Sequence, residues 1–297
     1  MEYRKFRLKN SLNEYYELTN PDIQHFLYQP TGLGFRGFST GYRFKNRYNR
    51  KEMEYDLPTV SGTMIFHKDT IQENYALYFE FMQFIQHSPL EIEYLITQYD
   101  DEWDKAKYAE CDVVQIDKSE TDEYGLLRTP IIFKCYTFWR DRELKTYTAK
   151  AEIEGEQLQI PMTFPFYFGK DSLRGIVIEN NGSLVAPLKV VVQGTCVNPT
   201  YRIFDENGNE YGACKFDGTF SSVEVESDTE NVVLRQNGMI VANPAKYEDL
   251  TIGNLDEDDY YLTFLNIKPG KNYMTASLGP NFKGEITFSW RDEWISF

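Results

Sequence analysis

Short runs of alternating apolar and polar residues, separated by turn dipeptides, recur along most of this 297-residue chain. Alternation with a period of two places successive side chains on opposite faces of a β-strand. The runs are bounded by Asn-Gly, Pro-Gly and Gly-Pro pairs, which favour tight turns between antiparallel strands. The pattern therefore predicts a mainly β protein built from short strands.

The N-terminal segment is the first example of this pattern. Residues 3–10 alternate so that Phe6 and Leu8 share one face of a strand, and residues 10–13 form a turn-like sequence. The run that begins at Tyr15 supplies the partner strand, so a hairpin is expected. Further on, Gly32, Gly34 and Gly37 predict a loop or bulge before the next strand-like run.

One segment has a different period. Tyr75, Tyr78, Phe79, Met82 and Ile85 recur at steps of three and four residues, which is typical of an amphipathic helix. Asp69 followed by Gln72 resembles a capping box at its start, and Ser88-Pro89 is expected to end it after His87. The first part of the chain is therefore predicted to be a β-sheet with one amphipathic helix.

The length of the chain favours two domains. From Asp141 to Gln159 the sequence is polar without a sustained period, so the boundary is expected near Lys150, with domains at 1–149 and 150–297. The second domain contains only strand-like runs at a spacing that predicts a β-sandwich. These runs are 175–179, 188–193, 201–204, 222–226, 232–235, 260–265, 272–278 and 285–290.

Composition restricts the functions of such a protein. The formal net charge is −15, which disfavours general nucleic-acid binding but is compatible with a conduit past which DNA slides. The aromatic fraction of 16% is high and suits packed sheets and protein interfaces. No window reaches the length of a membrane span and the first residues lack a signal-peptide core, so we expect the chain to be cytosolic when made.

The residues that most often carry chemistry are scattered. Cys111, Cys135, Cys196 and Cys214 form no C-x-x-C pair, so free thiols are expected. The three histidines have no second ligand at metal-binding spacing. Gly32 to Gly37 matches G-x-G-x-x-G literally, but β-like residues follow it where a nucleotide-binding motif requires a helix.

Two acidic segments are candidates for cation sites. Residues 205–210 resemble the start of a calcium loop, but Phe216 occupies the position of the closing glutamate, so a hairpin turn is the better interpretation. Residues 256–259 are consecutive acids, for which a solvated loop is favoured. The sequence also contains no nucleophile elbow, metalloprotease helix or phosphate loop. We therefore expect no cofactor, no metal site and no enzymatic activity.

Aromatic residues of the second half have two interpretations. Trp290, Trp294 and the Tyr260-Tyr261 pair are candidates for stacking on a sugar, but packing between the sheets is favoured. Paired carboxylates for glycoside cleavage are not identifiable from sequence, because acids are plentiful and their mutual geometry is unknown.

A basic and aromatic run stands out within this acidic chain. Arg43, Lys45 and Arg47 alternate with aromatic residues, and Arg50 and Lys51 extend the charge. The run is interpreted as a contact with acids of a neighbouring subunit, with a solvated hairpin and nucleic-acid binding as the alternatives. We take Arg43, Lys45 and Arg47 as the candidate subunit interface.

The order of these features resembles the distal tail proteins of siphophages, which are hub components of the tail tip. The likeness is carried by residues 6–10, Pro30-Thr-Gly-Leu-Gly-Phe, Ser61-Gly-Thr-Met-Ile-Phe before an aromatic helix, Pro89-Leu-Glu-Ile-Glu-Tyr after it, and the strand 126–139. In the second half, residues 178–190, Gly194 and Asn198-Pro199 resemble the family's galectin-like domain. Each motif is weak alone, and their order makes the argument.

The resemblance implies a structural role in the virion, after synthesis in the bacterial cytoplasm. It implies a homo-hexameric ring of N-terminal domains in the phage tail tip, or baseplate, between the tail-tube protein and the tail-associated hub protein. It also implies a galectin-like second domain for attachment of receptor-binding or other baseplate proteins, with no membrane partner and no specific nucleic acid. The alternatives are a carbohydrate-binding module for host recognition, a glycan hydrolase domain behind it, and a tail-tube subunit.

Overall fold

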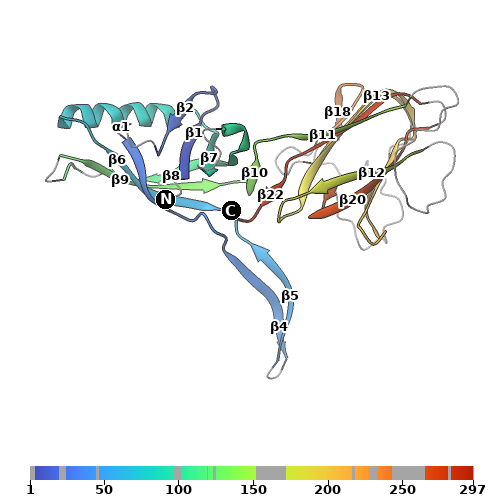
Figure 1. The fold of residues 1–297 in the computed structure, drawn as a ribbon, viewed down its shortest axis with the longest axis horizontal. Helices are drawn as coiled ribbons and strands as arrows, with labels where there is room; N and C mark the ends of the chain where they lie inside the picture. Colours follow the sequence, from blue (N-terminus) through green and yellow to red (C-terminus); the bar gives the residue numbers. More distant parts are fainter. Residues whose placement is uncertain are drawn as a thin grey trace. The chain divides into compact units, whose positions relative to one another are not determined.

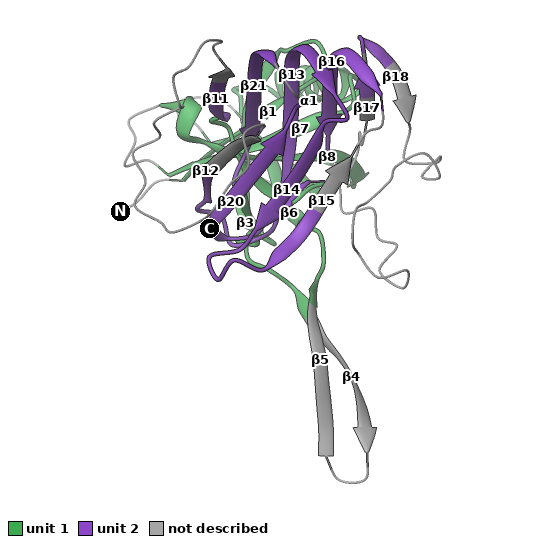
Figure 2. Ribbon diagram, turned by 90° about the vertical axis from the view of Figure 1, so that its right-hand side faces the viewer, with its two compact units in different colours: residues 1–143, 293–297 green, residues 144–292 purple. Residues whose placement is uncertain are grey.

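The computed structural model divides the chain into two compact units, and each is described by itself (Figures 1 and 2). Unit 1 comprises residues 1–143 and 293–297, and unit 2 comprises residues 144–292. The predicted mainly β fold is confirmed, because both units are built from antiparallel sheets. The structure describes residues 4–19, 25–44, 47–96, 102–118, 120–122, 125–151, 172–215, 218–227, 233–242, 265–279 and 282–296.

Unit 1 is built on a nine-stranded sheet whose main path runs β2-β1-β7-β8-β9-β6-β3. Strand β10 pairs with both β8 and β22, off this path. The strands are β1 (Arg4–Lys9), β2 (Tyr15–Glu17), β3 (His25–Thr31), β6 (Thr59–Phe66), β7 (Leu90–Ile96), β8 (Lys107–Ile116), β9 (Leu127–Cys135), β10 (Trp139–Asp141) and β22 (Glu293–Trp294). A second sheet contains β4 (Gly37–Phe44) and β5 (Arg47–Tyr55), and a 3-10 turn, η2, spans Trp103–Lys105.

The predicted N-terminal hairpin is confirmed. Strands β1 and β2 pair antiparallel, with Leu8 opposite Tyr16. The carboxamide oxygen of Asn10 accepts hydrogen bonds from the backbone N–H groups of Leu12 and Glu14, both at 3.0 Å. Asn13 supplies the left-handed residue of the turn, with φ 61°, a conformation that asparagine tolerates better than most residues.

The predicted amphipathic helix is also confirmed, as α1 (Ile71–Ile85). Its capping box was predicted one residue too early: Thr70 and Glu73 form it, and each side chain bonds the other's backbone N–H. The regular helix ends at Ile85 rather than at His87. Tyr78, Phe81 and Phe84 are buried on the face that packs against the sheet, where α1 lies along one side of the strands (Figure 1).

The two ends of the main sheet path meet in unit 1. The backbone N–H of Leu27 on β3 donates to the carbonyl of Leu18, just after β2, at 2.6 Å. Beside this contact the rings of Tyr16 and His25 stack with centroids 4.3 Å apart. Burial lowers the pKa of His25 to about 4; a hydrogen bond with the backbone of Glu17 opposes this and the charge of Lys68 adds to it.

Strand β3 is irregular in its second half. Gln29 has a φ of 47°, and the register with β6 shifts between Tyr28 and Thr31. Pro30 lies within this stretch and has no backbone N–H to donate. The outer side of this terminal strand therefore does not offer a regular ladder of hydrogen-bonding groups.

Unit 2 is a β-sandwich, as predicted. A seven-stranded sheet follows the order β11-β21-β13-β16-β17-β18, with β19 paired to β13, and a four-stranded sheet follows β12-β20-β14-β15. Inward side chains of both sheets form one core that includes Ile178, Val190, Tyr201 and Phe288. The strands are β11 (Lys145–Ala151), β12 (Ser172–Asn180), β13 (Ala186–Val197), β14 (Thr200–Phe204), β15 (Glu210–Lys215), β16 (Thr219–Glu226), β17 (Val233–Gln236), β18 (Met239–Ala242), β19 (Asn266–Ile267), β20 (Gly270–Ser277) and β21 (Lys283–Trp290).

The compact units differ from the expected division at two places. Residues 144–149 belong to unit 2, because β11 pairs with β21 along its whole length, from Lys145 opposite Trp290 to Ala151 opposite Gly284. Residues 293–297 belong to unit 1, because β22 pairs with β10. Unit 2 is thus inserted in the sequence of unit 1.

The half-buried His25 makes unit 1 sensitive to acid. Because the folded-state pKa of His25 lies below the ordinary value of 6.5, the unfolded chain binds the extra proton first, and stability falls as the pH drops from about 6.5 towards about 4. His25→Gln should flatten this part of the stability profile, whereas His87→Gln, at an exposed position, should leave it unchanged. Denaturant midpoints measured between pH 4 and 7 test this; parallel profiles for wild type and His25→Gln would contradict it.

Candidate assembly site

The ribbon of β4 and β5 carries the candidate interface residues. Its strands pair from Gly37 opposite Tyr55 to Phe44 opposite Arg47, and among the described residues neither strand pairs with any other. A two-stranded ribbon is marginally stable in water by itself. The ribbon is therefore a segment for which packing against another surface is favourable.

The structure places two of the three predicted interface residues in this ribbon. Arg43 lies on β4 opposite Tyr48, and Arg47 is the first residue of β5. Lys45 lies outside the described residues. The backbone register thus brings Arg43 and Arg47 to neighbouring positions at the turn end of the ribbon; their role as an interface remains a prediction.

Exposed apolar residues lie where the ribbon connects to β3 and β6. They are Phe35, Tyr55 and Leu57, which are 55%, 37% and 42% exposed. The rings of Phe35 and Tyr55 meet edge to face with centroids 5.7 Å apart. We call these three residues the ribbon-base patch. Clustered exposed apolar side chains of this kind are typical of protein contact sites.

The glycine-rich segment between β3 and β4 allows a close approach of two backbone segments. Gly32 has a φ of +82°, and a Cβ at this position would lie 1.8 Å from the carbonyl oxygen of Thr59. Only glycine allows β3 and the start of β6 to approach so closely. The segment connects two strands, so the loop interpretation of the G-x-G-x-x-G match is confirmed.

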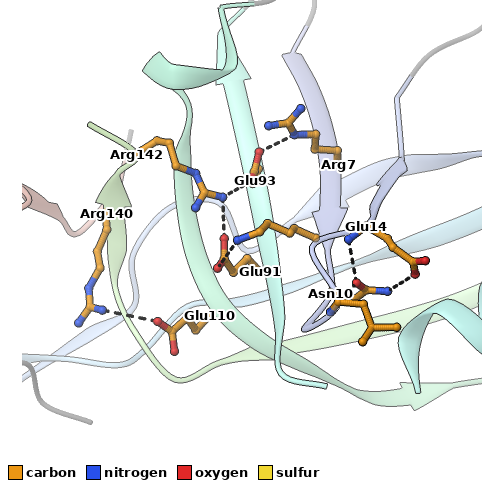
Figure 3. A network of polar contacts seen from close by, with 10 residues as sticks. Arg7, Asn10, Glu14, Glu91, Glu93, Glu110, Arg140 and Arg142 are labelled. Atoms are coloured by element: carbon orange, nitrogen blue, oxygen red, sulfur yellow. Dashed lines mark hydrogen bonds and ion pairs between the residues drawn. The ribbon is translucent and has the colours of Figure 1, made fainter. Parts of the chain in front are cut away.

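A buried charge network holds the central strands of unit 1 (Figure 3). Glu93 on β7 is fully buried and accepts from Arg7 on β1, with Nε and Oε2 2.5 Å apart. Its other carboxylate oxygen, Oε1, accepts from Nη2 of Arg142. A buried carboxylate requires such partners, because removal from water is costly for an unpaired charge.

The neighbouring charges extend this network across the sheet. Glu91 bonds Lys9 at 3.1 Å and Arg142 at 2.6 Å. The Arg142 guanidinium lies 4.3 Å from the ring of Tyr108, and that of Arg7 lies 3.9 Å from the ring of Trp103. These carboxylates are paired with cations that the same unit supplies, so their geometry is that of a structural network.

Sequence reasoning missed this network. Its signal was present in the alternation of Arg7 and Lys9 on one strand and Glu91 and Glu93 on another, which the pairing of β1 with β7 places opposite one another. Without that register the same charges read as a solvated face.

The buried thiols are poor nucleophiles and poor metal ligands. Cys111, Cys135 and Cys196 are free and buried, as expected. Burial raises the pKa of Cys135 to about 12, and burial followed by the charge of Cys135 raises that of Cys111. Within the described part of the chain, no group of three or more His, Cys, Asp or Glu side chains is arranged to hold a metal ion.

The acidic loop candidate of unit 2 is a turn, as predicted. Asp205 joins β14 to β15 and accepts hydrogen bonds from the backbone N–H groups of Asn207 and Asn209, both at 2.9 Å. Hydrogen bonds from Asn209 hold the pKa of Asp205 below its ordinary value. The acidic run at 256–259 lies outside the described residues.

The aromatic candidates for sugar stacking have other surroundings. Trp290 is buried in the core of unit 2, which confirms its packing role. Trp294 lies on β22 in unit 1, where its indole N–H donates to Asp141 at 3.0 Å. Tyr260 and Tyr261 lie outside the described residues.

Among the helices that the structure describes, none is long and apolar enough to span a bilayer.

Comparison with known proteins matches both units. Residues 5–136 match the family model described as distal tail protein, N-terminal domain. A chain of the phage P2 baseplate in its activated conformation with Ca is similar over 99% of this chain and 100% of its own, with a TM-score of 0.54 and 16% identity. The crystal structure of the SPP1 Dit protein covers 97% of this chain and 98% of its own, with a TM-score of 0.58 and 10% identity. No curated protein sequence matches significantly.

These matches define the class first: the fold is that of phage tail and baseplate structural proteins. The match over residues 5–136 then identifies this part of the chain as an N-terminal domain of the distal tail protein family, so the resemblance read from the sequence is confirmed.

The close approach of Gly32 to Thr59 gives a test of the fold. Gly32→Ala introduces a Cβ that meets the Thr59 carbonyl and forces a left-handed alanine, which alone costs about 1–2 kcal/mol. Gly34→Ala is the matched control, because nothing lies within 4 Å of a Cβ there. Thermal unfolding should show a clearly lower midpoint for Gly32→Ala than for Gly34→Ala, and equal midpoints would contradict the close approach.

The charge network predicts unequal effects of two similar substitutions. Glu93→Gln leaves Arg7 and Arg142 without their buried counter-charge and should lower the free energy of unfolding by about 2–4 kcal/mol. Glu91 is partly exposed, so Glu91→Gln should cost about 1 kcal/mol or less. Denaturant unfolding measures both values, and a loss for Glu91→Gln as large as that for Glu93→Gln would count against the central role of Glu93.

Proposed function

We propose that this distal tail protein forms a homo-hexameric ring in the phage tail tip, in which unit 1 builds the ring. The observation that carries the proposal is the family match of residues 5–136, together with a fold shared with a baseplate chain and a Dit protein over almost their entire lengths. In this proposal the protein is structural and catalyses no reaction.

The proposed position in the virion is between the tail-tube protein and the tail-associated hub protein. The structure of SPP1 Dit is described as a paradigm of the hub adsorption apparatus in phages that infect Gram-positive hosts, which supports a hub role by likeness. Unit 2, as a galectin-like sandwich, would carry receptor-binding or other baseplate proteins. DNA would pass through the ring without specific contacts, in keeping with a net charge of −15.

The ribbon of β4 and β5 is the proposed contact between neighbouring subunits. A closed ring uses heterologous contacts, in which one surface of a subunit meets a different surface of the next. The ribbon has no other strand partner among the described residues, and its basic residues occur in a chain with 46 acidic and 31 basic side chains. An acidic neighbour of the same kind therefore complements its charge, and the ribbon-base patch adds apolar area.

The proposal is tested by the oligomeric state. Reversing the charges of the ribbon with Arg43→Glu, Lys45→Glu and Arg47→Glu replaces attraction by repulsion, so the hexamer should dissociate. Multi-angle light scattering should give about six times the 34.9 kDa monomer mass for wild type, and a lower mass for the triple variant.

A charge-matched control separates the contact from a general effect of net charge. Lys134→Glu, Lys271→Glu and Lys283→Glu change three exposed lysines outside the ribbon and alter the net charge equally, so the oligomer should persist. An unchanged mass for the ribbon variant would overturn the assigned interface. A wild-type protein that stays monomeric at every concentration would contradict ring formation by this chain.

A further inference from the structure

Strand β22 belongs to unit 1 although it follows all of unit 2 in the sequence. It pairs with β10, with Trp294 opposite Trp139 and Glu293 opposite Arg140. Strand β10 in turn pairs with β8 through Arg140 opposite Tyr108. The two strands that flank unit 2 in the sequence are therefore neighbours in one sheet.

The contacts of β22 are specific. Arg140 and Glu293 form an ion pair with Nε and Oε1 2.7 Å apart, and their side chains are only 5% and 9% exposed. The carboxylate of Glu110 lies further from Arg140, at 3.8 Å. Removing Glu293 thus takes the closer counter-charge from a buried guanidinium, which is unfavourable.

The indole of Trp294 adds a second set of contacts. It donates to Asp141 at 3.0 Å, and the Nζ atom of Lys107 lies 3.9 Å from its ring centroid. Lys107 also pairs with Asp141 at 2.5 Å. Strand β22 therefore links side chains of β8 and β10 as well as completing the backbone pairing.

Unit 2 holds together the two ends of its own segment. Lys145 lies opposite Trp290 in the pairing of β11 with β21, and its Nζ atom is 2.5 Å from Oδ2 of the buried Asp292. Glu293 follows Asp292 directly in the chain. When unit 2 is folded, the contact between Lys145 and Asp292 therefore leaves only a short length of chain between Arg140 and Glu293.

We propose that β22 is a latch that couples completion of unit 1 to the folding of unit 2. When unit 2 is unfolded, pairing of β22 with β10 must close a loop that spans residues 142–292, and such closure costs conformational entropy. The two register pairs, the Arg140–Glu293 ion pair and the contacts of Trp294 must offset that cost. When unit 2 is folded its segment ends already lie together, and the latch closes without that penalty.

The consequence for assembly is that unit 1 is completed only in chains whose unit 2 has been made and folded. This consequence rests on the proposed function, because it takes unit 1 as the ring-forming part. The coupling itself does not, because it can be measured within one chain without reference to oligomerisation.

Hydrogen exchange in the full chain tests the coupling in one direction. Phe288→Ala removes a ring from the core of unit 2 and should raise amide exchange of residues 139–141 in unit 1 by about tenfold or more. Thr287→Ser is the control, since it keeps the hydroxyl that bonds Thr148 and should change nothing. Unchanged exchange of residues 139–141 while unit 2 exchanges faster would overturn the proposal.

The reverse direction provides a second test, because coupling between two sites is reciprocal. Glu293→Ala lies outside unit 2 but should accelerate exchange in β11 and β21, whereas Glu179→Ala, at an exposed site of unit 2, should not. If exchange became faster only in β10, β22 would be a local contact within unit 1, and the proposed latch would be rejected. Normal coupling in a protein that forms no ring would instead count against the proposed function alone.

Discussion

A single buried carboxylate positions much of unit 1. Glu93 lies in the middle of the sheet without exposure to solvent, and it is tolerated there only because Arg7 from β1 and Arg142 from the segment after β10 reach it. These two cations fix the register of β1 against β7 and the direction in which the chain leaves β10. Unit 2 begins two residues after Arg142. The chain therefore enters unit 2 from a residue that the ion pair with Glu93 holds in place.

The regular elements were predictable because their patterns are local. Phe6 and Leu8 alternate with charged residues, and α1 repeats its aromatic residues at helical spacing, so neither needed tertiary information. Strand β11 was not recognised, because Lys145–Ala151 is an outer strand rich in polar residues and takes its place only through pairing with β21. Strand β22 was not recognised either, because a strand of two residues is too short to show an alternating pattern. Its pairing of Glu293 with Arg140 joins residues that are separated in the sequence by all of unit 2.

The candidate site shows the same division. The basic run at Arg43, Lys45 and Arg47 was visible as a charge anomaly, whereas the ribbon-base patch depends on Phe35 and Tyr55 meeting where the chain enters and leaves the ribbon. Identities of 16% and 10% with structures of the same fold show how little of the sequence the architecture requires. Inward positions need only an apolar side chain of suitable size, so the family likeness resides in the order of elements rather than in a short motif.

The irregular end of strand β3 has a consequence for how copies of this chain can pair. An open sheet edge invites edge-to-edge pairing between copies, which can grow without limit into fibres. Pro30 and the left-handed Gln29 interrupt that edge, so a second copy finds no continuous row of donors and acceptors there. Pairing of sheets through this part of β3 is thereby disfavoured, which leaves association between copies to side-chain contacts elsewhere on the surface.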